Sequence, residues 1–161
     1  MQQQRSRPAC PTSIAVNEVT NKTYVANYGK VCLISNTCIN AGSVTVIDGA
    51  TNSATELQLP QPNLPHPVRV ALNANTNKIY VANQFSSDVI VIDGNANAVT
   101  TSSTASFPYD IAVNLATNRI YVASFSELAV GTSQTVTVID GTTDATAPIN
   151  DSKASDRLQS Q

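Results

Sequence analysis

One sequence unit occurs three times along this chain of 161 residues. Each copy has an apolar tetrapeptide ending in Asn, then a Thr-Asn-Lys or Thr-Asn-Arg turn, a Tyr-Val-Ala segment and a Val-Ile-Asp-Gly segment. The tetrapeptides begin at Ile14, Val70 and Ile111, and a proline stands three residues before each of them. Such close internal repetition predicts a repeat fold in which each copy is one supersecondary unit.

Each unit predicts four short antiparallel strands. The first three cover the tetrapeptide, the Tyr-Val-Ala segment and the Val-Ile-Asp segment, which are rich in the β-branched residues that favour strands. In the second unit Tyr80 and Ala82 alternate with Ile79 and Val81, so both faces are apolar, as in a sheet covered on both sides. A weaker fourth strand is predicted at residues 54–59, 98–104 and 146–149.

The spacing of the units favours one all-β architecture. They recur after 56 and then 41 residues, and no window has the 3.6-residue apolar period of a helix. Short strands at such spacing are typical of a β-propeller of four-stranded antiparallel blades, with a β-sandwich as the alternative. Three blades make an incomplete propeller, because closed ones have four or more. We therefore expect either a fragment of a longer protein or closure by self-association, most simply of two copies.

The predicted organisation follows the repeats. The N-terminal segment is 1–11, and the polar segment 150–161 is expected to be disordered. The predicted blades are 12–66 with a long inserted loop at 28–43, 67–107, and 108–149 with an incomplete outer strand.

The repeated strings resemble a known family. TNKTYVAN, TNKIYVAN and TNRIYVAS, each followed by VTVIDG or VIVIDG, are similar to the YVTN-type β-propeller repeat over about residues 11–149. The resemblance implies a secreted or cell-surface protein, extracellular or periplasmic, of six or seven blades that takes part in binding or adhesion. Related propellers include haem- and quinone-enzyme subunits and lactonase-like enzymes, but none of their catalytic residues matches a position here.

Charge and hydropathy exclude several function classes. The net charge is −2, only 12% of residues are charged, and no Lys/Arg run is present, which argues against nucleic-acid binding. No apolar stretch approaches the roughly 20 residues that span a bilayer. Arg5 and Arg7 are not followed by an apolar segment, so no signal peptide is predicted in the given sequence. The extracellular or periplasmic location therefore rests on the family resemblance.

Cysteine and histidine positions do not predict a metal site or any other cofactor. Cys32 and Cys38 lie in one predicted loop, where a disulfide would close the insertion and imply an oxidising compartment. The alternative is that these two and Cys10 are free thiols. The three cysteines and the single His66 have no recognised zinc-ligand spacing.

Loop lengths point to one end of the blades as the candidate binding surface. First-to-second connections have equal lengths, whereas the second-to-third connections, at 28–43, 84–88 and 125–135, differ. In an up-and-down sheet these variable loops share one end with the fourth-to-first connections, and we call that end the variable-loop face. The candidate binding residues on it are Tyr28, Phe85 and Phe125 in the loops, and Ser13, Arg69, Tyr109 and Asp110 at the first strands.

Three of the polar residues near this face have open interpretations. Arg69 and Asp110 either contact a polar ligand at the channel mouth, pair with each other, or are solvated, and the last two interpretations are preferred. His66 stands between two prolines, and we expect an exposed loop residue rather than a catalytic base.

Residues that recur in every unit are expected to be structural. The Asp-Gly pairs should form turns in which the carboxylate accepts backbone N–H groups and Gly adopts a positive φ. The tyrosine at the same place in each unit should pack between blades with its hydroxyl hydrogen-bonded. These residues are Asp48, Asp93 and Asp140, and Tyr24, Tyr80 and Tyr121.

No catalytic motif is present. The sequence has no Gly-rich phosphate loop, HExxH or GxSxG. We expect a non-catalytic interaction module that binds a protein or glycan through the variable-loop face. The alternatives are a fragment of a lyase- or lactonase-type enzyme whose active site lies in further blades, and a structural surface-layer component.

Overall fold

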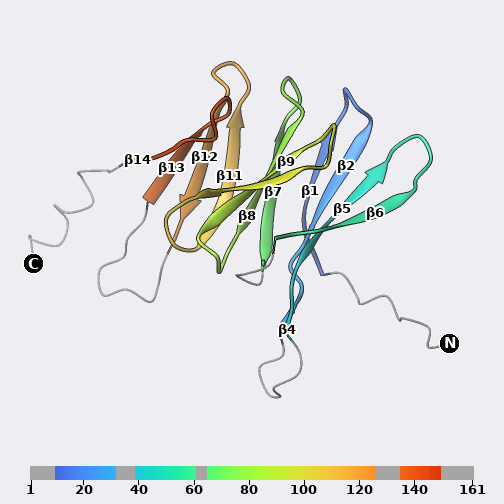
Figure 1. The fold of residues 1–161 in the computed structure, drawn as a ribbon, viewed down its shortest axis with the longest axis horizontal. Coiled ribbons are helices and arrows are strands. Elements are labelled where there is room, and N and C mark those ends of the chain that lie inside the picture. Colours follow the sequence, from blue (N-terminus) through green and yellow to red (C-terminus); the bar gives the residue numbers. More distant parts are fainter. Residues whose placement is uncertain (1–9, 32–38, 61–64, 126–134, 150–161) are drawn as a thin grey trace, which may run out of the picture.

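All regular structure in the described part of the chain is β. The computed structural model describes residues 10–31, 39–60, 65–125 and 135–149. Within these ranges the main elements are three four-stranded antiparallel sheets, one for each copy of the repeat (Figure 1). No helix long and apolar enough to cross a membrane occurs in the described ranges.

Each sheet is an up-and-down blade, with its strands in sequence order. Blade 1 contains β1 (Pro11–Asn17), β2 (Lys22–Asn27), β5 (Ser43–Asp48) and β6 (Ala54–Gln58). Blade 2 contains β7 (Pro67–Asn73), β8 (Lys78–Asn83), β9 (Asp88–Asp93) and β10 (Val99–Ser103). Blade 3 contains β11 (Pro108–Asn114), β12 (Arg119–Ser124), β13 (Thr135–Asp140) and β14 (Thr146–Ile149). The short pair β3 (Lys30–Val31) and β4 (Ile39–Asn40) lies between β2 and β5.

All twelve predicted strands are present, and the weak fourth strands fall within the ranges expected for them. The first strands are longer than the apolar tetrapeptides, because each begins at its proline. Each also contains a β-bulge directly after that proline, which the strand prediction did not include. The extra residues of the three bulges are Thr12, Val68 and Tyr109.

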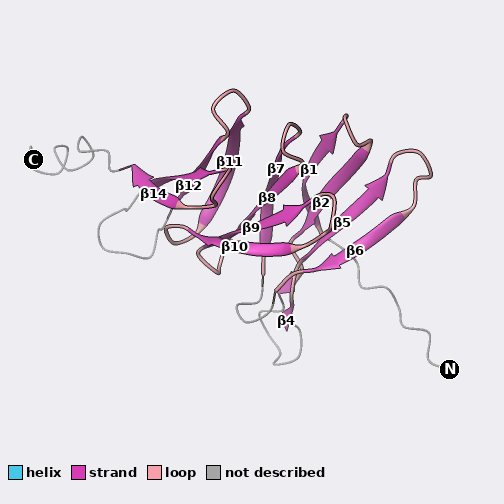
Figure 2. Cartoon of the chain, turned by 45° about the horizontal axis from the view of Figure 1, so that its top comes forward, coloured by secondary structure: helices cyan, strands magenta, loops and turns pink. Residues whose placement is uncertain are grey.

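The blades pack face to face, with blade 2 between blades 1 and 3 (Figure 2). Ile79 and Val81 of β8 pack in a cluster with blade 1, while Tyr80 packs in a second cluster with blade 3. The predicted alternation along this strand is therefore confirmed. Blades 1 and 2 each present the face that bears their tyrosine, here called the Tyr face, to the following blade. The opposite face, here called the Ile/Val face, contacts the preceding blade in blades 2 and 3.

Only blade 2 is covered on both faces. Tyr24 and Tyr80 are 0% exposed between blades, whereas Tyr121 is 37% exposed on the Tyr face of blade 3. Ile14 and Val16 on the Ile/Val face of blade 1 are 64% and 56% exposed. The prediction that the blades are buried on both sides is thus right for blade 2. The two end faces are exposed, as expected for an open array of three blades, because no described blade lies against them.

The tyrosine hydroxyls do not behave as expected. The buried hydroxyl oxygens of Tyr24 and Tyr80 have no hydrogen-bond partner among the described residues. Burial, reinforced by the negative charges of Asp144 and Asp140, raises the pKa of Tyr80 to about 12. In blades 1 and 2 the tyrosine therefore contributes the packing of its ring rather than a hydroxyl hydrogen bond.

The Asp-Gly turns confirm the predicted hydrogen bonds of the carboxylates and contradict the predicted positive φ of the glycines. In the first turn, Oδ1 of Asp48 accepts the backbone N–H groups of Ala50 and Thr51, both at 2.9 Å. The two later turns repeat this pattern. Positive φ angles, however, occur at Asn52, Asn97 and Asp144, and not at the glycines.

These turns need glycine because an asparagine side chain of the first-to-second turn lies too close to leave room for a Cβ. A Cβ on Gly94 would collide with the side chain of Asn77, and the corresponding glycines meet the corresponding asparagines in the same way. The N–H of Gly94 donates to the Asn77 carbonyl oxygen at 2.8 Å. This contact joins the third-to-fourth turn of the blade to its first-to-second turn, so both turns sit at the same end.

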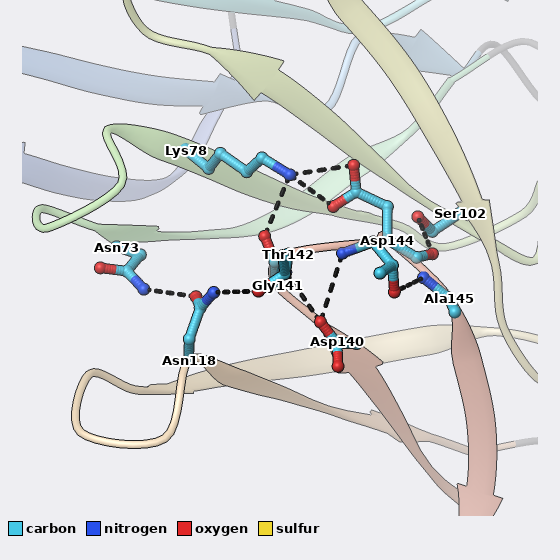
Figure 3. Close-up of polar contacts among 10 residues, drawn as sticks. Asn73, Lys78, Ser102, Asn118, Asp140, Gly141, Thr142, Asp144 and Ala145 are labelled. Atoms are coloured by element: carbon cyan, nitrogen blue, oxygen red, sulfur yellow. Dashed lines mark hydrogen bonds and ion pairs between the residues drawn. The ribbon is translucent and has the colours of Figure 1, made fainter.

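Side chains from these turns also connect neighbouring blades (Figure 3). Between blades 2 and 3, Nδ2 of Asn73 donates to Oδ1 of Asn118 at 2.8 Å. Nζ of Lys78 donates to the Gly141 carbonyl oxygen at 3.0 Å and forms an ion pair with Asp144 at 2.8 Å. All of these donors belong to blade 2, and all of the acceptors belong to blade 3.

The same contacts join blades 1 and 2. Nδ2 of Asn17 donates to Oδ1 of Asn77 at 2.8 Å, and Nζ of Lys22 donates to the Gly94 carbonyl oxygen at 3.1 Å. We call this repeated set the Asn/Lys ladder. It explains why the first-to-second loops have constant length, since a longer or shorter loop would move a donor away from the next blade.

The ladder predicts a specific stability defect for Asn73→Asp. The variant keeps the Oδ1 atom that accepts the Asn75 N–H, but it replaces a fully buried donor with a carboxylate oxygen facing Asn118. We expect the free energy of unfolding to fall by at least about 2 kcal/mol, measured by urea titration. Asn75→Asp, at an exposed position of the same turn, is the matched control and should change it by under about 0.5 kcal/mol. Equal effects of the two substitutions would contradict the ladder.

The turn carboxylates predict an acid-sensitive fold. Backbone hydrogen bonds hold the pKa of each turn aspartate below its ordinary value of 3.8. Their stabilising contribution is therefore present above the unfolded-state pKa and is lost as the pH falls through the lower folded-state pKa. We expect the melting temperature to decrease below about pH 4, and the triple variant Asp48→Asn, Asp93→Asn, Asp140→Asn to show a flatter acid profile. Identical acid profiles would show that these carboxylates do not set the acid stability.

Candidate functional site

A repeated main-chain hydrogen bond builds the variable-loop face. In each blade the residue that follows the second strand donates its N–H to the carbonyl oxygen of the residue before the first-strand proline. The three bonds are Tyr28 to Cys10 at 2.9 Å, Gln84 to His66 at 3.1 Å, and Phe125 to Phe107 at 3.1 Å. They hold the start of each second-to-third loop beside the end of the preceding connection.

Four aromatic rings from three blades form an edge-to-face series on this end. Ring centroids are 5.0 Å apart for Tyr28 and His66, 5.0 Å for His66 and Phe85, and 5.9 Å for Phe85 and Phe107. Tyr28 follows β2, His66 precedes β7, Phe85 follows β8 and Phe107 precedes β11. We call this series the aromatic row. It extends from blade 1 to blade 3, and pairs of this geometry stabilise by about 0.5–1.5 kcal/mol each.

The expectation that His66 is an exposed loop residue is wrong. Its exposed fraction is 6%, because the ring packs between Tyr28 and Phe85. Its backbone N–H donates to Oδ1 of Asn83 at the end of β8. The flanking Pro65 and Pro67, both buried, restrict the backbone that turns the ring inward. These two prolines are the feature of the sequence that could have indicated a restricted backbone at His66.

The aromatic row is partly open to solvent. Phe85 is 53% exposed, and two further candidate residues, Tyr109 and Phe125, are 58% and 42% exposed. Phe107 has a φ of 56°, a left-handed conformation that is unfavourable for a bulky residue. Its contacts with Phe85 and the backbone of Phe125 hold it there. Bulky residues in this conformation are concentrated at functional sites.

Arg69 and Asp110 form an ion pair, which is one of the open interpretations. Nε of Arg69 lies 3.1 Å from Oδ1 of Asp110, and the two side chains are 44% and 56% exposed. The pair joins the start of β7 to the start of β11. An exposed pair of this kind contributes at most about 1 kcal/mol, so it separates at little cost in free energy. Since both side chains are also exposed, both groups are accessible to a polar ligand.

Ser13, the equivalent position in blade 1, has a structural contact. Its hydroxyl oxygen accepts the N–H of Val70 at 3.2 Å, and the neighbouring Thr12 hydroxyl donates to the Pro67 carbonyl oxygen at 3.0 Å. These bonds join the first strands of blades 1 and 2. The bulges lie at this point, and a bulge redirects the side chains around it. Ligand contact at Ser13 stays a prediction.

The remaining predictions on this face concern residues that are only partly described. Cys32 and Cys38, and with them the disulfide, lie outside the described residues, as does most of the loop after Phe125. Cys10 is an exposed free thiol. Among the described residues no group of three His, Cys, Asp or Glu side chains is arranged to hold a metal ion. The described residues of this face present exposed ring surface and the Arg69–Asp110 ion pair.

Comparison with known proteins shows the fold. No family model and no curated protein matches the sequence. Among solved structures, hydrazine synthase from Kuenenia stuttgartiensis aligns with 94% of this chain at 20% identity and a TM-score of 0.69. The WD40 repeats of RRP9 align with 89% at 11% identity and 0.67, and a Bacteroides fragilis protein assigned as a 6-phosphogluconolactonase with 90% at 15% and 0.62.

The described chain spans 39% of the length of each of these three chains. At such identities the likeness concerns the fold and not the activity. Together with the three separate four-stranded antiparallel sheets, it shows that this chain has an all-β fold of the β-propeller type.

Proposed function

We propose that this chain is a non-catalytic interaction module that binds a protein partner through the variable-loop face. The observation that carries the proposal is the aromatic row with its exposed member Phe85, together with the exposed rings of Tyr109 and Phe125 at the same end of the blades. Aromatic residues and arginine are enriched in protein interfaces and supply most hot spots. The Arg69–Asp110 pair adds a polar contact between the starts of β7 and β11, at the same end of the blades. Binding of a glycan is the other form of the proposal, because the same rings offer stacking surfaces.

The two ends of the blades differ in the contacts that their side chains make, and this difference supports the proposed binding face. The Asn/Lys ladder and the Asp-Gly turns engage the polar side chains of the constant-loop end in structural contacts. At the variable-loop face, the second-to-third loops differ in length and sequence from one blade to the next. A rigid scaffold with variable loops at one end is the usual arrangement of a binding surface.

The repeats also support an exported protein of the YVTN type. The three strings beginning at Thr20, Thr76 and Thr117 closely match that repeat, and only 12% of residues are charged. The extracellular or periplasmic location is part of the proposal and follows from this resemblance. It would place the free thiol of Cys10 and the pair Cys32 and Cys38 in an oxidising environment.

A propeller enzyme is the second candidate. It is favoured by the similarity in fold to the Bacteroides fragilis protein assigned as a lactonase, at 15% identity. Against it, the repeated aspartates, which are the most regular acidic residues of the chain, accept backbone N–H groups in turns. In this alternative the catalytic residues belong to further blades.

Binding experiments with face variants test the main proposal. Arrays of purified extracellular proteins and of glycans serve as probes, and the affinity of each hit is measured for the variants Phe85→Ala and Tyr109→Ala. We expect either substitution to raise the dissociation constant at least about tenfold, as for a hot spot. Val19→Ala is the matched control, because Val19 is 77% exposed in a first-to-second turn at the opposite end. It should leave the affinity unchanged.

The same experiment separates the alternatives. Loss of binding in Val19→Ala but not in Phe85→Ala would place the partner elsewhere and contradict the proposal. Hits confined to the glycan array would replace the protein partner by a glycan. Turnover of a lactone by the purified chain would contradict a non-catalytic module.

A further inference from the structure

Each blade ends on a strand whose outer edge has no partner strand among the described residues. The first strands of neighbouring blades contact each other, so the fourth strands β6, β10 and β14 lie on the outside of the stack (Figure 2). The outer edge of such a strand presents main-chain N–H and C=O groups with which another extended chain can pair.

The register of β10 shows which of its residues form this edge. Just beyond its two ends, the Ala98 carbonyl oxygen accepts the N–H of Asp93 at 2.9 Å, and the Thr104 N–H donates to the Ser87 carbonyl oxygen at 3.0 Å. Residues of an antiparallel strand alternate between bonding to their partner strand and facing away from it. The even-numbered residues of β10 therefore bond to β9, and the main-chain groups of the others face outward. These outward residues are Val99, Thr101 and Ser103.

The central outward position differs between the three blades. The registers place Glu56 of β6, Thr101 of β10 and Pro148 of β14 at equivalent points, opposite the same position of the third strand. Proline has no N–H to donate, and a charge disfavours the approach of another strand, so both residues protect a sheet edge. The sequence of β10, Val-Thr-Thr-Ser-Ser, has neither a charge nor a proline. Among the three described outer edges, that of blade 2 is therefore the unprotected one.

Neighbouring blades hold β10 in position on both of its faces. On one face, Val99 packs against the hydrophobic cluster between blades 1 and 2. On the other, the hydroxyl of the buried Ser102 donates to the Asp144 carbonyl oxygen of blade 3 at 3.2 Å. All four residues of β14, by contrast, are exposed. The edge of β10 is thus already ordered, which lowers the entropic cost of pairing with it.

We propose that the outer edge of β10 binds an extended segment of a partner protein, which becomes a fifth strand of blade 2. The main-chain groups of the edge supply the affinity, in the manner of β-strand addition. The segment that fits is uncharged, lacks proline and is rich in Thr and Val, because Thr and β-branched residues form favourable cross-strand pairs with the Val and Thr side chains of β10.

This edge differs in kind from the blade faces. Neighbouring blades pack against each other through their faces, so an additional blade would cover a face and leave the outer edge of β10 open. The inference does not depend on the proposed function either, because the rings of the variable-loop face take no part in it. An edge that fails to bind a strand would leave that function untouched.

Titration with a synthetic peptide is the first test. The probe is the uncharged, end-blocked peptide Ser-Thr-Val-Thr-Val-Thr-Ser, followed by two-dimensional amide NMR spectra of the chain. We expect the amide signals of β10 to shift and those of β6 and β14 to stay unchanged. The matched peptide Ser-Thr-Val-Pro-Pro-Thr-Ser lacks a central N–H on either edge and should bind at least about fivefold more weakly. No shift in β10 at millimolar peptide would overturn the proposal.

Two variants of the chain transfer to blade 2 the protective residues of its neighbours. Thr101→Pro should raise the dissociation constant of the peptide at least about fivefold, since it removes the central N–H donor. Thr101→Glu should change it in the same direction. Both should fold normally by circular dichroism, because the main chain of Thr101 does not bond to β9 and its side chain is exposed.

Thr100→Ala is the matched control on the same strand. Thr100 is exposed and its main chain bonds to β9, and β14 has Ala147 at the equivalent position. The variant should bind the peptide like the unmodified chain. Equal binding by Thr101→Pro and Thr100→Ala would contradict pairing through the outward main-chain groups.

Amide exchange of single residues tests whether the edge is open before the partner binds. In the free chain, Thr101 should exchange faster than Thr100 and Ser102, and the peptide should slow Thr101 alone of the three. Slow exchange of Thr101 in the free chain at every concentration would show that another segment of the chain already covers the edge. Protection of Thr101 that increases with chain concentration would assign the edge to a second copy. Either result would overturn the partner strand.

Discussion

The burial of apolar sheet faces between neighbouring blades is the interaction on which the rest of this structure depends. A single four-stranded blade has two apolar faces and cannot cover either by itself. In blade 2, the side chains on both faces of β8 and β9 are almost completely buried. The polarity of the packing, a Tyr face against an Ile/Val face, then sets the order of the blades and gives the stack two different ends.

This packing also divides the two ends of each blade by role. At one end, short turns of fixed length bring asparagine and lysine donors onto the next blade. At the other end, one main-chain bond per blade is repeated, and the described side chains beside it differ between the blades. The aromatic row lies at that second end, which is why a binding role is assigned to it and a structural role to the first.

Much of the fold could be predicted from the sequence, because the repeat makes equivalent residues visible. The alternation of Tyr80 and Ile79 gave both faces of blade 2, and the Asp-Gly pairs gave the turns. What could not be predicted depends on contacts between residues that are far apart in the sequence. Gly94 is required by the approach of Asn77, not by its own φ, and Tyr80 is required for its ring, not for its hydroxyl.

The candidate site was predicted less completely. Exposure of Tyr109 and the position of Arg69 follow from their place at the start of a first strand. The inward turn of His66 depends on rings contributed by two different blades, Tyr28 and Phe85, which are far from each other in sequence. Likewise the bulge after each first-strand proline is a property of strand pairing, which local sequence does not specify.

Amide hydrogen exchange of the purified chain tests the face-to-face packing of the blades most directly. Strands covered on both sides open least often, so the slowest exchange is expected in β8 and β9, with the second and third strands of blades 1 and 3 exchanging sooner. Equal protection in all three blades, or the fastest exchange in blade 2, would contradict the account.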